Sequence, residues 1–441
     1  MGLGPEGNMV EDVKFLIKAG ALVSVYDLKS EARLKSHLVL LRSLGLANHV
    51  CGSIPAEDLI DMDLIILSHE YPRDSSFLKA VDEKNRRIEL DKTKIVEKKE
   101  KPIPIEYPET LFFRRSPPVT VIGIMGQCGK STIISMLSPM LEVVCSKTDN
   151  QGFFVIDPES DKGIISNLRK VRSGDIVLMR LLGQTMKELH SIHISPQVAV
   201  FASEPAREAY HDSPFEILNY QTYNNFIVAS DEVIDAIRSQ KVQPKAKMLR
   251  TKISIVPETW SLIKIDGHDR QNAALAFQTG KLFRVDDDLA REILIKWKPL
   301  KGRLEMVKKV RGVEYYNDTA SICPLSTEQA IRISRDRNVI LIFGGTRSSH
   351  DYKNLYSLLP EYVKMVILLP GSGTIHERQT ITKLKDLKSI SVPSIEEAVL
   401  LAAENAGKND RVVFSPGFEA NGLDNSRKER GDRFVKAVRG L

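Results

Sequence analysis

The sequence predicts an α/β protein made of three domains, and two observations support this prediction. The chain has 441 residues, which is too many for one hydrophobic core and corresponds to roughly three domains of about 150 residues. Short apolar strands also alternate with amphipathic helical stretches, an order that is typical of doubly wound α/β domains. We expect the domains to cover residues 1–95, 96–298 and 299–441.

The composition favours a globular protein that does not bind nucleic acid. Hydrophobic residues make up 42% and charged residues 27% of the chain, and 63 basic against 57 acidic residues leave a net charge of +6. No arginine-rich block follows the pattern of a phosphate-backbone binder. No apolar run approaches the roughly 18–20 residues needed to span a bilayer, so we expect neither a membrane span nor an N-terminal signal peptide. Four scattered cysteines include no C-x-x-C pair, so we expect a cytoplasmic protein without disulfides or a cysteine zinc site. We also expect a monomer.

The first domain is expected to be Rossmann-like, with a helix over residues 9–19 and strands over 21–26 and 64–67. The polar stretch 91–102 then reads as connecting sequence.

A glycine turn opens this domain, Gly2-Leu3-Gly4-Pro5-Glu6-Gly7, and Asp27 follows about 20 residues later at the end of a strand. This spacing is typical of a dinucleotide fingerprint, in which glycines let the backbone approach a diphosphate. No strand precedes the turn in this sequence, which starts at Met1, so either the start is misassigned or that strand is absent. Binding of a nucleotide diphosphate through Gly4, Gly7 and Asp27 and a purely structural turn both remain open.

The second domain is expected to be of the P-loop type, because the strand 120–124 leads into Gly126-Gln127-Cys128-Gly129-Lys130-Ser131-Thr132 and then into a helix over 132–141. Backbone N–H groups of such a loop face phosphates, Lys130 neutralises charge, and the Ser131 hydroxyl can reach Mg²⁺. The loop departs from the strict Walker form, since its earlier glycine would fall at Ile124. A chance strand, loop and helix is the alternative to phosphate binding.

The third domain follows a hinge at 297–303, where proline and glycine interrupt a helical pattern. Buried strands are expected at 339–344, 365–369 and 411–415, separated by helical spacings, which indicates a second Rossmann-like unit.

The short loop G-x-x-G-K-S-T is similar to the ATP loop of the Mur ligases, which add amino acids to the UDP-muramyl precursor of peptidoglycan. Further segments resemble this family in the same order along essentially the whole chain. They are 103–117, Asp149-Asn150-Gln151-Gly152, Gly267-His268-Asp269-Arg270-Gln271-Asn272, Gly302-Arg303-Leu304-Glu305, Asn317-Asp318-Thr319, 343–345 with 351–352, Ser415-Pro416 and 429–434. Within the family, the short first domain points to the D-glutamate-adding branch.

The resemblance implies that ATP phosphorylates the carboxylate of a UDP-sugar-peptide and that an incoming amino group displaces the phosphate. It implies Lys130, Arg303 and Asp318 as the catalytic groups. It further implies ATP binding by Gly126–Thr132, His268, Asp269, Asn272, Arg303 and Asp318, and Mg²⁺ binding by Ser131. Substrate binding is implied for Asn150, Ser415 and Phe418, in addition to Gly4, Gly7 and Asp27 of the first turn. Each role has a structural alternative: Asn272 and Asp318 could cap helices, and His268 could be a surface turn residue.

The resemblance breaks at the second metal site and at the lysines of the family. Met179 stands at the glutamate ligand, Arg207 at the histidine unless a shift recruits His211, Asn224 at the carbamylated lysine, and Ala320 and Ser348 at two further lysines. A thioether does not bind a hard cation and a guanidinium repels one, so we expect no second metal ion. Arg180, Arg207 or Arg347 could instead offer fixed charge to phosphates, or could simply be solvated.

Three functions follow from these patterns. The first is an ATP-dependent ligase that adds D-glutamate to UDP-N-acetylmuramoyl-L-alanine with Mg²⁺. The second is a nucleotide-binding pseudoenzyme of the same fold. An NAD-dependent oxidoreductase is a third, but it leaves Gly126–Thr132 unexplained.

Overall fold

The computed structural model describes residues 1–4, 8–52, 62–69, 71–72, 75–90, 101–158, 160, 162–205, 214–240, 242–260, 268–334, 336–346, 350–420 and 427–441, without the side chain of His268. The chain divides into two compact units. The first comprises residues 1–126, 137–251 and 278–285, and the second comprises 127–136, 252–277 and 286–441. No helix in the described part has the length and apolar character that a bilayer crossing requires.

The first unit begins with two pairs of parallel strands. Strand β1 (Ser24–Asp27) pairs with β2 (Asn48–Cys51), and β3 (Ile65–Ile66) pairs with β4 (Ile105–Glu106). Helices α1 (Val10–Lys18), α2 (Glu31–Ser43) and α3 (Ser76–Leu90) accompany them. Strand β4 lies beyond the boundary expected at residue 95, so the pairing of this region reaches at least residue 106. The division at 95/96 and 298/299 otherwise stays a prediction.

The first three residues take the place of the strand that the glycine turn lacks in sequence. The amino group of Met1 donates to the Ile66 carbonyl, and Ser68 N donates to Met1 O at 2.8 Å. On the other side, Gly2 N donates to Tyr26 O at 2.6 Å. Residues 1–3 are therefore hydrogen-bonded to strands on both sides.

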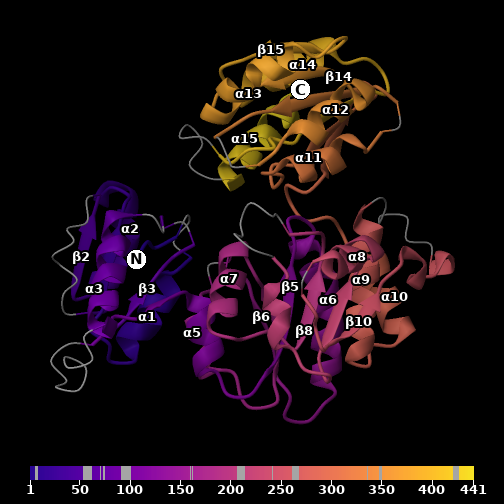
Figure 1. The fold of residues 1–441 in the computed structure, drawn as a ribbon. Helices are drawn as coiled ribbons and strands as arrows, with labels where there is room; N and C mark the ends of the chain where they lie inside the picture. The colour runs from indigo at the N-terminus through magenta and orange to yellow at the C-terminus, as the bar shows by residue number, and fades with distance from the viewer. Residues whose placement is uncertain are drawn as a thin grey trace. The chain divides into compact units, whose positions relative to one another are not determined.

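The first unit also contains a six-stranded parallel sheet in the order β10-β9-β8-β5-β7-β6. Figure 1 labels four of its strands, β5, β6, β8 and β10. The strands are β5 (Thr120–Met125), β6 (Phe153–Ile156), β7 (Ile176–Arg180), β8 (Val198–Phe201), β9 (Phe226–Ala229) and β10 (Lys247–Arg250). Helices α5 (Pro108–Arg115), α6 (Lys130–Ser146), α7 (Gly183–Ser191) and α8 (Asp231–Ser239) belong to the same stretch of chain. Strand β5 lies between β7 and β8, so the strand order reverses beside it, and ligands of such sheets usually bind at the carboxyl ends of the strands at this point.

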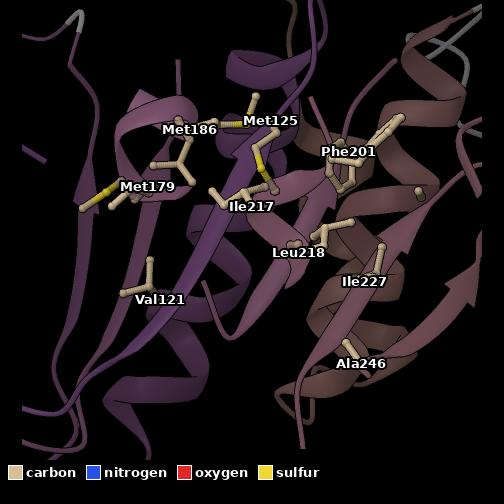
Figure 2. Packing of buried hydrophobic residues seen from close by; sticks show 14 of the residues in the cluster. Val121, Met125, Met179, Met186, Phe201, Ile217, Leu218, Ile227 and Ala246 are labelled. Atoms are coloured by element: carbon tan, nitrogen blue, oxygen red, sulfur yellow. The ribbon is translucent and has the colours of Figure 1, made fainter. Parts of the chain in front are cut away.

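One face of this sheet is buried in an apolar cluster that includes Val121, Met179, Phe201 and Ile227, and Met186 of α7 packs against it (Figure 2). Side chains alternate between the two faces along a strand. The near-continuous burial of β5, β7 and β8 explains why their sequences read as unbroken apolar runs.

The second unit contains α9 (His268–Leu282) in part, α10 (Asp287–Lys296) and a sheet of order β11-β12-β16-β13-β14-β15. Its strands are β11 (Glu305–Val310), β12 (Val313–Asn317), β13 (Val339–Phe343), β14 (Val363–Leu368), β15 (Lys388–Ser391) and β16 (Arg411–Phe414), and only the β11–β12 pair is antiparallel.

Two apolar clusters cover the two faces of this sheet. One contains residues of α11 (Pro324–Ile331) and α12 (Lys353–Tyr362), and the other contains residues of α14 (Ile395–Asn405) and α15 (Arg427–Arg439). Helix α13 (Ser372–Thr382) precedes β15. The three expected strands appear within one or two residues as β13, β14 and β16, and the α/β fold class is confirmed.

Candidate nucleotide-binding site

The loop after β5 is shaped by two glycines. Gly126 has φ +119°, and a Cβ there would lie 2.7 Å from the backbone N and O of Ser203. Gly129 has φ +85° directly before α6 begins at Lys130. Positive φ and close backbone approach both favour glycine, so these two positions explain the loop's composition locally.

A pocket in the second unit opens on this loop. Its lining includes six of the residues expected from sequence, Cys128, Gly129, Thr132, Asp269, Arg303 and Asp318. The other lining residues are Trp297, Pro299, Leu300, Leu304, Ser321, Ser326 and Gln329. Segments from four places in the sequence therefore meet at one concave surface.

Two cationic side chains stand at the loop. Lys130 is 8% exposed, and its Nζ donates to Gln127 O at 3.1 Å. Arg303 Nη2 donates to Ser131 Oγ at 3.1 Å. The Trp297 indole also donates to Ser135 Oγ at 2.9 Å, which ties the segment before Arg303 to the first turns of α6. The loop thus combines a helix N-terminus with two positive charges, an arrangement suited to polyphosphate.

Asp318 supplies a buried carboxyl group to the pocket. It is 4% exposed, and its Oδ1 accepts from Leu304 N at 3.0 Å. Burial raises the pKa of Asp318 to about 6, opposed by hydrogen bonds from Ser321 and Ser415 and by the charge of Arg303. Because Cys323 is the N-cap of α11, Asp318 does not cap that helix. The capping alternative for Asp318 is wrong.

The segment expected near the adenine lies at the start of α9. Asp269 lines the pocket, and Asn272 is buried with its Nδ2 donating to Asp269 Oδ1 at 3.3 Å. Helix α9 begins at His268, so Asn272 lies inside the helix and does not cap it. The side chain of His268 lies outside the described part of the chain.

Comparisons with known proteins agree with this geometry. Residues 302–418 match the family described as Mur ligase, glutamate ligase domain. The chain is 25% identical to the UDP-N-acetylmuramoylalanine–D-glutamate ligase of Clostridioides difficile, covering 100% of the chain and 98% of that protein, and 26% identical to that of Streptococcus thermophilus, covering 100% and 96%. The chain is therefore similar to Mur ligases over nearly its whole length.

Solved structures support the same fold. MurC of Thermotoga maritima aligns with a TM-score of 0.57 at 15% identity over 100% of this chain and 98% of that one. MurF of Thermotoga maritima, solved with ADP, aligns with a TM-score of 0.55 at 13% identity over 95% of each chain.

The first glycine turn is closed by its own neighbours, unlike the loop after β5. Asp27 is buried and accepts from Leu3 N at 2.7 Å and from Lys29 N at 2.8 Å, while Lys29 Nζ donates to Gly4 O at 2.6 Å. Gly7 lies outside the described residues. Both carboxylate oxygens of Asp27 hold backbone in place, which favours the structural reading of the turn. A role of Gly4, Gly7 and Asp27 in substrate binding stays a prediction.

The remaining predicted substrate residues, Asn150, Ser415 and Phe418, are not among the residues that line the pocket. Asn150 has φ +61° and precedes β6, so it lies at the amino end of the sheet, opposite the end where the loop begins. Ser415 is fully buried and donates to Thr327 Oγ1 at 3.0 Å. Phe418 is fully buried and stacks on Tyr352 with ring centroids 4.7 Å apart. Their roles as substrate contacts stay predictions.

Met179 of β7, which stands where the resemblance expects a metal-binding glutamate, lies on an apolar face of the sheet. Met179 lies fully buried in the cluster of Figure 2, where a sulfur offers nothing to Mg²⁺. Asn224 is exposed and precedes β9, and Ala320 N donates to Gly302 O at 2.9 Å. Arg207, His211, Arg347 and Ser348 lie outside the described residues. Within the described ranges no group of three His, Cys, Asp or Glu side chains could hold a metal.

Some lining residues were not expected as site residues. Ser326 and Gln329 lie three residues apart on α11, and therefore on one face of that helix. Their i, i+3 spacing after Asn317-Asp318-Thr319 is a signal that could have identified them.

Proposed function

We propose that this chain is an ATP-dependent ligase that joins D-glutamate to the carboxylate of UDP-N-acetylmuramoyl-L-alanine, acting as a cytoplasmic monomer. The observation that carries this proposal is the pocket where the glycine loop meets Arg303 and Asp318. The names of the relatives, which match over nearly their whole length, support the same substrates.

The reaction has two displacement steps. A carboxylate oxygen of the sugar peptide attacks the γ-phosphorus of ATP, the bond from that phosphorus to the ADP oxygen breaks, and an acyl phosphate forms. The amino nitrogen of D-glutamate then attacks the acyl carbon, the carbon–oxygen bond to phosphate breaks, and the amine proton passes to solvent. Lys130 and Arg303 stabilise the negative charge that spreads over the transferred phosphoryl oxygens.

One Mg²⁺ fits the loop. The Ser131 hydroxyl offers an oxygen of the kind Mg²⁺ takes alongside phosphate oxygens and waters. When bound, the ion would neutralise phosphate charge as a Lewis acid. Arg303 donates to Ser131 Oγ in this structure, so a metal-bound Ser131 requires a different partner for Arg303, for which phosphate is suited.

The pseudoenzyme alternative predicts ATP binding without turnover, and the comparisons lend it no support because the relatives are named as ligases. The deciding assay combines purified protein, UDP-N-acetylmuramoyl-L-alanine, D-glutamate and Mg-ATP. We expect phosphate release that needs both substrates, and a product whose mass equals the sum of the two less water. Tight ATP binding with no substrate-dependent phosphate release would instead favour the pseudoenzyme.

A further inference from the structure

Arg303 stands on a turn whose backbone is left-handed on both sides of it. Gly302 has φ +71° and Leu304 has φ +44°. A bulky L residue such as leucine rarely adopts a positive φ, so neighbouring groups must hold this conformation. The shape of the turn therefore depends on contacts that the residues of the turn make with other side chains.

Two carboxylates hold the backbone on either side of Arg303. Gly302 N donates to Glu305 Oε2 at 3.0 Å, and Leu304 N donates to Asp318 Oδ1 at 3.0 Å. The Leu304 side chain packs against an apolar cluster of the same unit. A hydrogen bond to a carboxylate is stronger than one between neutral groups. Arg303 thus leaves the turn between two backbone N–H groups that are each held by a carboxylate.

Glu305 also reaches the residue before Asp318. Its Oε2 atom accepts a second hydrogen bond from Asn317 Nδ2 at 3.3 Å, and the two residues are paired across β11 and β12. Asn317 is buried, and its Oδ1 accepts from Thr319 N at 3.3 Å and from Thr319 Oγ1 at 2.8 Å. These contacts orient the amide of Asn317 with its NH₂ group toward Glu305. One oxygen of Glu305 therefore joins the segment that carries Arg303 to the segment that carries Asp318.

The segment before the turn is fixed at its other end. Trp297 Nε1 donates to Ser135 Oγ at 2.9 Å, and Arg303 Nη2 donates to Ser131 Oγ at 3.1 Å. Ser131 and Ser135 are one helical turn apart on α6 and so lie on the same side of it. Trp297 precedes Arg303 by six residues, so a shift of the backbone at Gly302 could move the guanidinium while Trp297 stays in place. The position of the guanidinium then depends on the contacts of the turn itself.

We propose that Glu305 is a positioning residue that fixes the turn of Arg303, so that the guanidinium reaches the nucleotide phosphates at the start of α6. The inference rests on the proposed function, since it takes Arg303 as a phosphate-binding group. Glu305 is not among the residues that line the pocket. Its carboxylate acts through hydrogen bonds to the protein and not as a base or a metal ligand.

A double-variant cycle, measured by calorimetry with Mg²⁺ and the non-hydrolysable analogue AMP-PNP, tests this role. We expect Arg303→Met and Glu305→Ala each to weaken the AMP-PNP affinity about 10-fold, the loss typical of one charge-assisted hydrogen bond. In the Arg303→Met background, Glu305→Ala should change the affinity by less than about 2-fold, because its effect passes through Arg303. Additive losses, about 100-fold in the double variant, would overturn the proposal.

Two single variants separate positioning from other roles of a carboxylate. Glu305→Gln keeps an oxygen that can accept both hydrogen bonds, so we expect it to bind AMP-PNP within about 3-fold of wild type. Equal losses in Glu305→Gln and Glu305→Ala would show that the charge itself acts, and would contradict the proposal. Glu314→Ala is the matched control, because Glu314 lies in the same strand pair and accepts from Lys309 and Tyr316. Its AMP-PNP affinity should equal that of wild type, and a loss as large as in Glu305→Ala would reduce the effect to the stability of the strand pair.

Folding and turnover are measured separately from the cycle. Chemical denaturation reports whether each variant is folded. If Glu305→Ala does not fold, Glu305→Met, which keeps the length of the side chain without an acceptor, takes its place in the cycle. Non-additive losses of AMP-PNP affinity in a protein that catalyses no ligation would end the proposed function and leave the role of Glu305 intact. No AMP-PNP affinity in wild type, or no loss of it in Glu305→Ala, would overturn the inference.

Discussion

The two glycine turns of this chain look alike in sequence and differ in structure. Each combines closely spaced glycines with a following helix, α1 in one case and α6 in the other. In the first turn, the Asp27 carboxylate accepts a hydrogen bond from Leu3 N, and Lys29 Nζ donates one to Gly4 O. The second turn lines a pocket together with Arg303 and Asp318. A glycine-rich turn before a helix therefore indicates a backbone shape, and the groups around it decide whether a ligand can enter.

The helix after the first turn is held in the same way. Asp12 of α1 accepts from Ile164 N at 2.8 Å and from Ser166 N at 3.0 Å. Backbone N–H groups that could receive an anion thus receive a carboxylate of the chain itself. In the first region the Asp12 and Asp27 carboxylates bind backbone amides of the chain itself, whereas the second turn lines a pocket together with Arg303.

The largest effect is expected from Lys130→Met, which removes the charge of the second turn. We expect kcat of the ligase reaction to fall about 10²- to 10³-fold, because one preorganised charged donor to the transferred group is lost. Steady-state phosphate release measures this effect, and Lys187→Met, at an exposed lysine of α7, is the control. A kcat of Lys130→Met equal to that of wild type would show that the charge of the second turn does not serve the reaction.

Asp12→Asn tests whether the first region is closed by an internal carboxylate. Burial raises the pKa of Asp12 to about 6 from 3.8. The stabilisation from this group is therefore fully present below pH of about 4 and is lost as pH rises through about 6. Asparagine does not titrate, so the stability of the variant relative to wild type should increase by up to about 3 kcal/mol between pH 4 and pH 8. Chemical denaturation across this pH range measures the difference in unfolding free energy between variant and wild type, with Asp149→Asn, at an exposed aspartate, as the control. A difference that does not change with pH would contradict a structural role of the buried Asp12 carboxylate.

Asp318→Asn tests whether the buried carboxylate of the pocket contributes to the reaction with ATP. The pKa of Asp318 is raised to about 6 by burial, so the group is ionised above that pH and protonated below it. We expect kcat/KM for ATP to fall about 10-fold, the loss typical of one charged hydrogen bond, and the acidic limb of the pH profile near 6 to disappear. An acidic limb that persists in the variant assigns it to another group.

The smallest effect is expected from Asp27→Asn in the first turn. The asparagine amide keeps one acceptor oxygen but loses the charge, so the free energy of unfolding should fall by about 1 kcal/mol. KM for the sugar nucleotide should stay near the wild-type value if Asp27 is structural. A large rise in KM without loss of stability would show that the sequence-based reading of Asp27 as a substrate contact is right.

The parts of the fold that sequence predicted are those set by local patterns. Strand β5, the loop and α6 follow from an apolar run, two glycines and a helical stretch that are contiguous in the chain. Strands β13, β14 and β16 follow from buried apolar runs in the same way. Such patterns require no knowledge of distant partners.

The parts that sequence missed depend on contacts between distant residues. Nothing local shows that residues 1–3 bind β1 and β3 as a strand, or that β4 pairs across the expected boundary at residue 95. The hydrogen bond from Trp297 to Ser135 joins residues 162 positions apart.

The central claim, that this chain transfers a phosphoryl group from ATP to a carboxylate before forming an amide, is tested most directly by oxygen tracing. UDP-N-acetylmuramoyl-L-alanine labelled with ¹⁸O in its carboxylate is incubated with the protein, D-glutamate and Mg-ATP, and the released phosphate is analysed by mass spectrometry. Ligation through an acyl phosphate predicts one ¹⁸O atom in each phosphate released. Phosphate without label, or no phosphate above the level formed without D-glutamate, would contradict the claim.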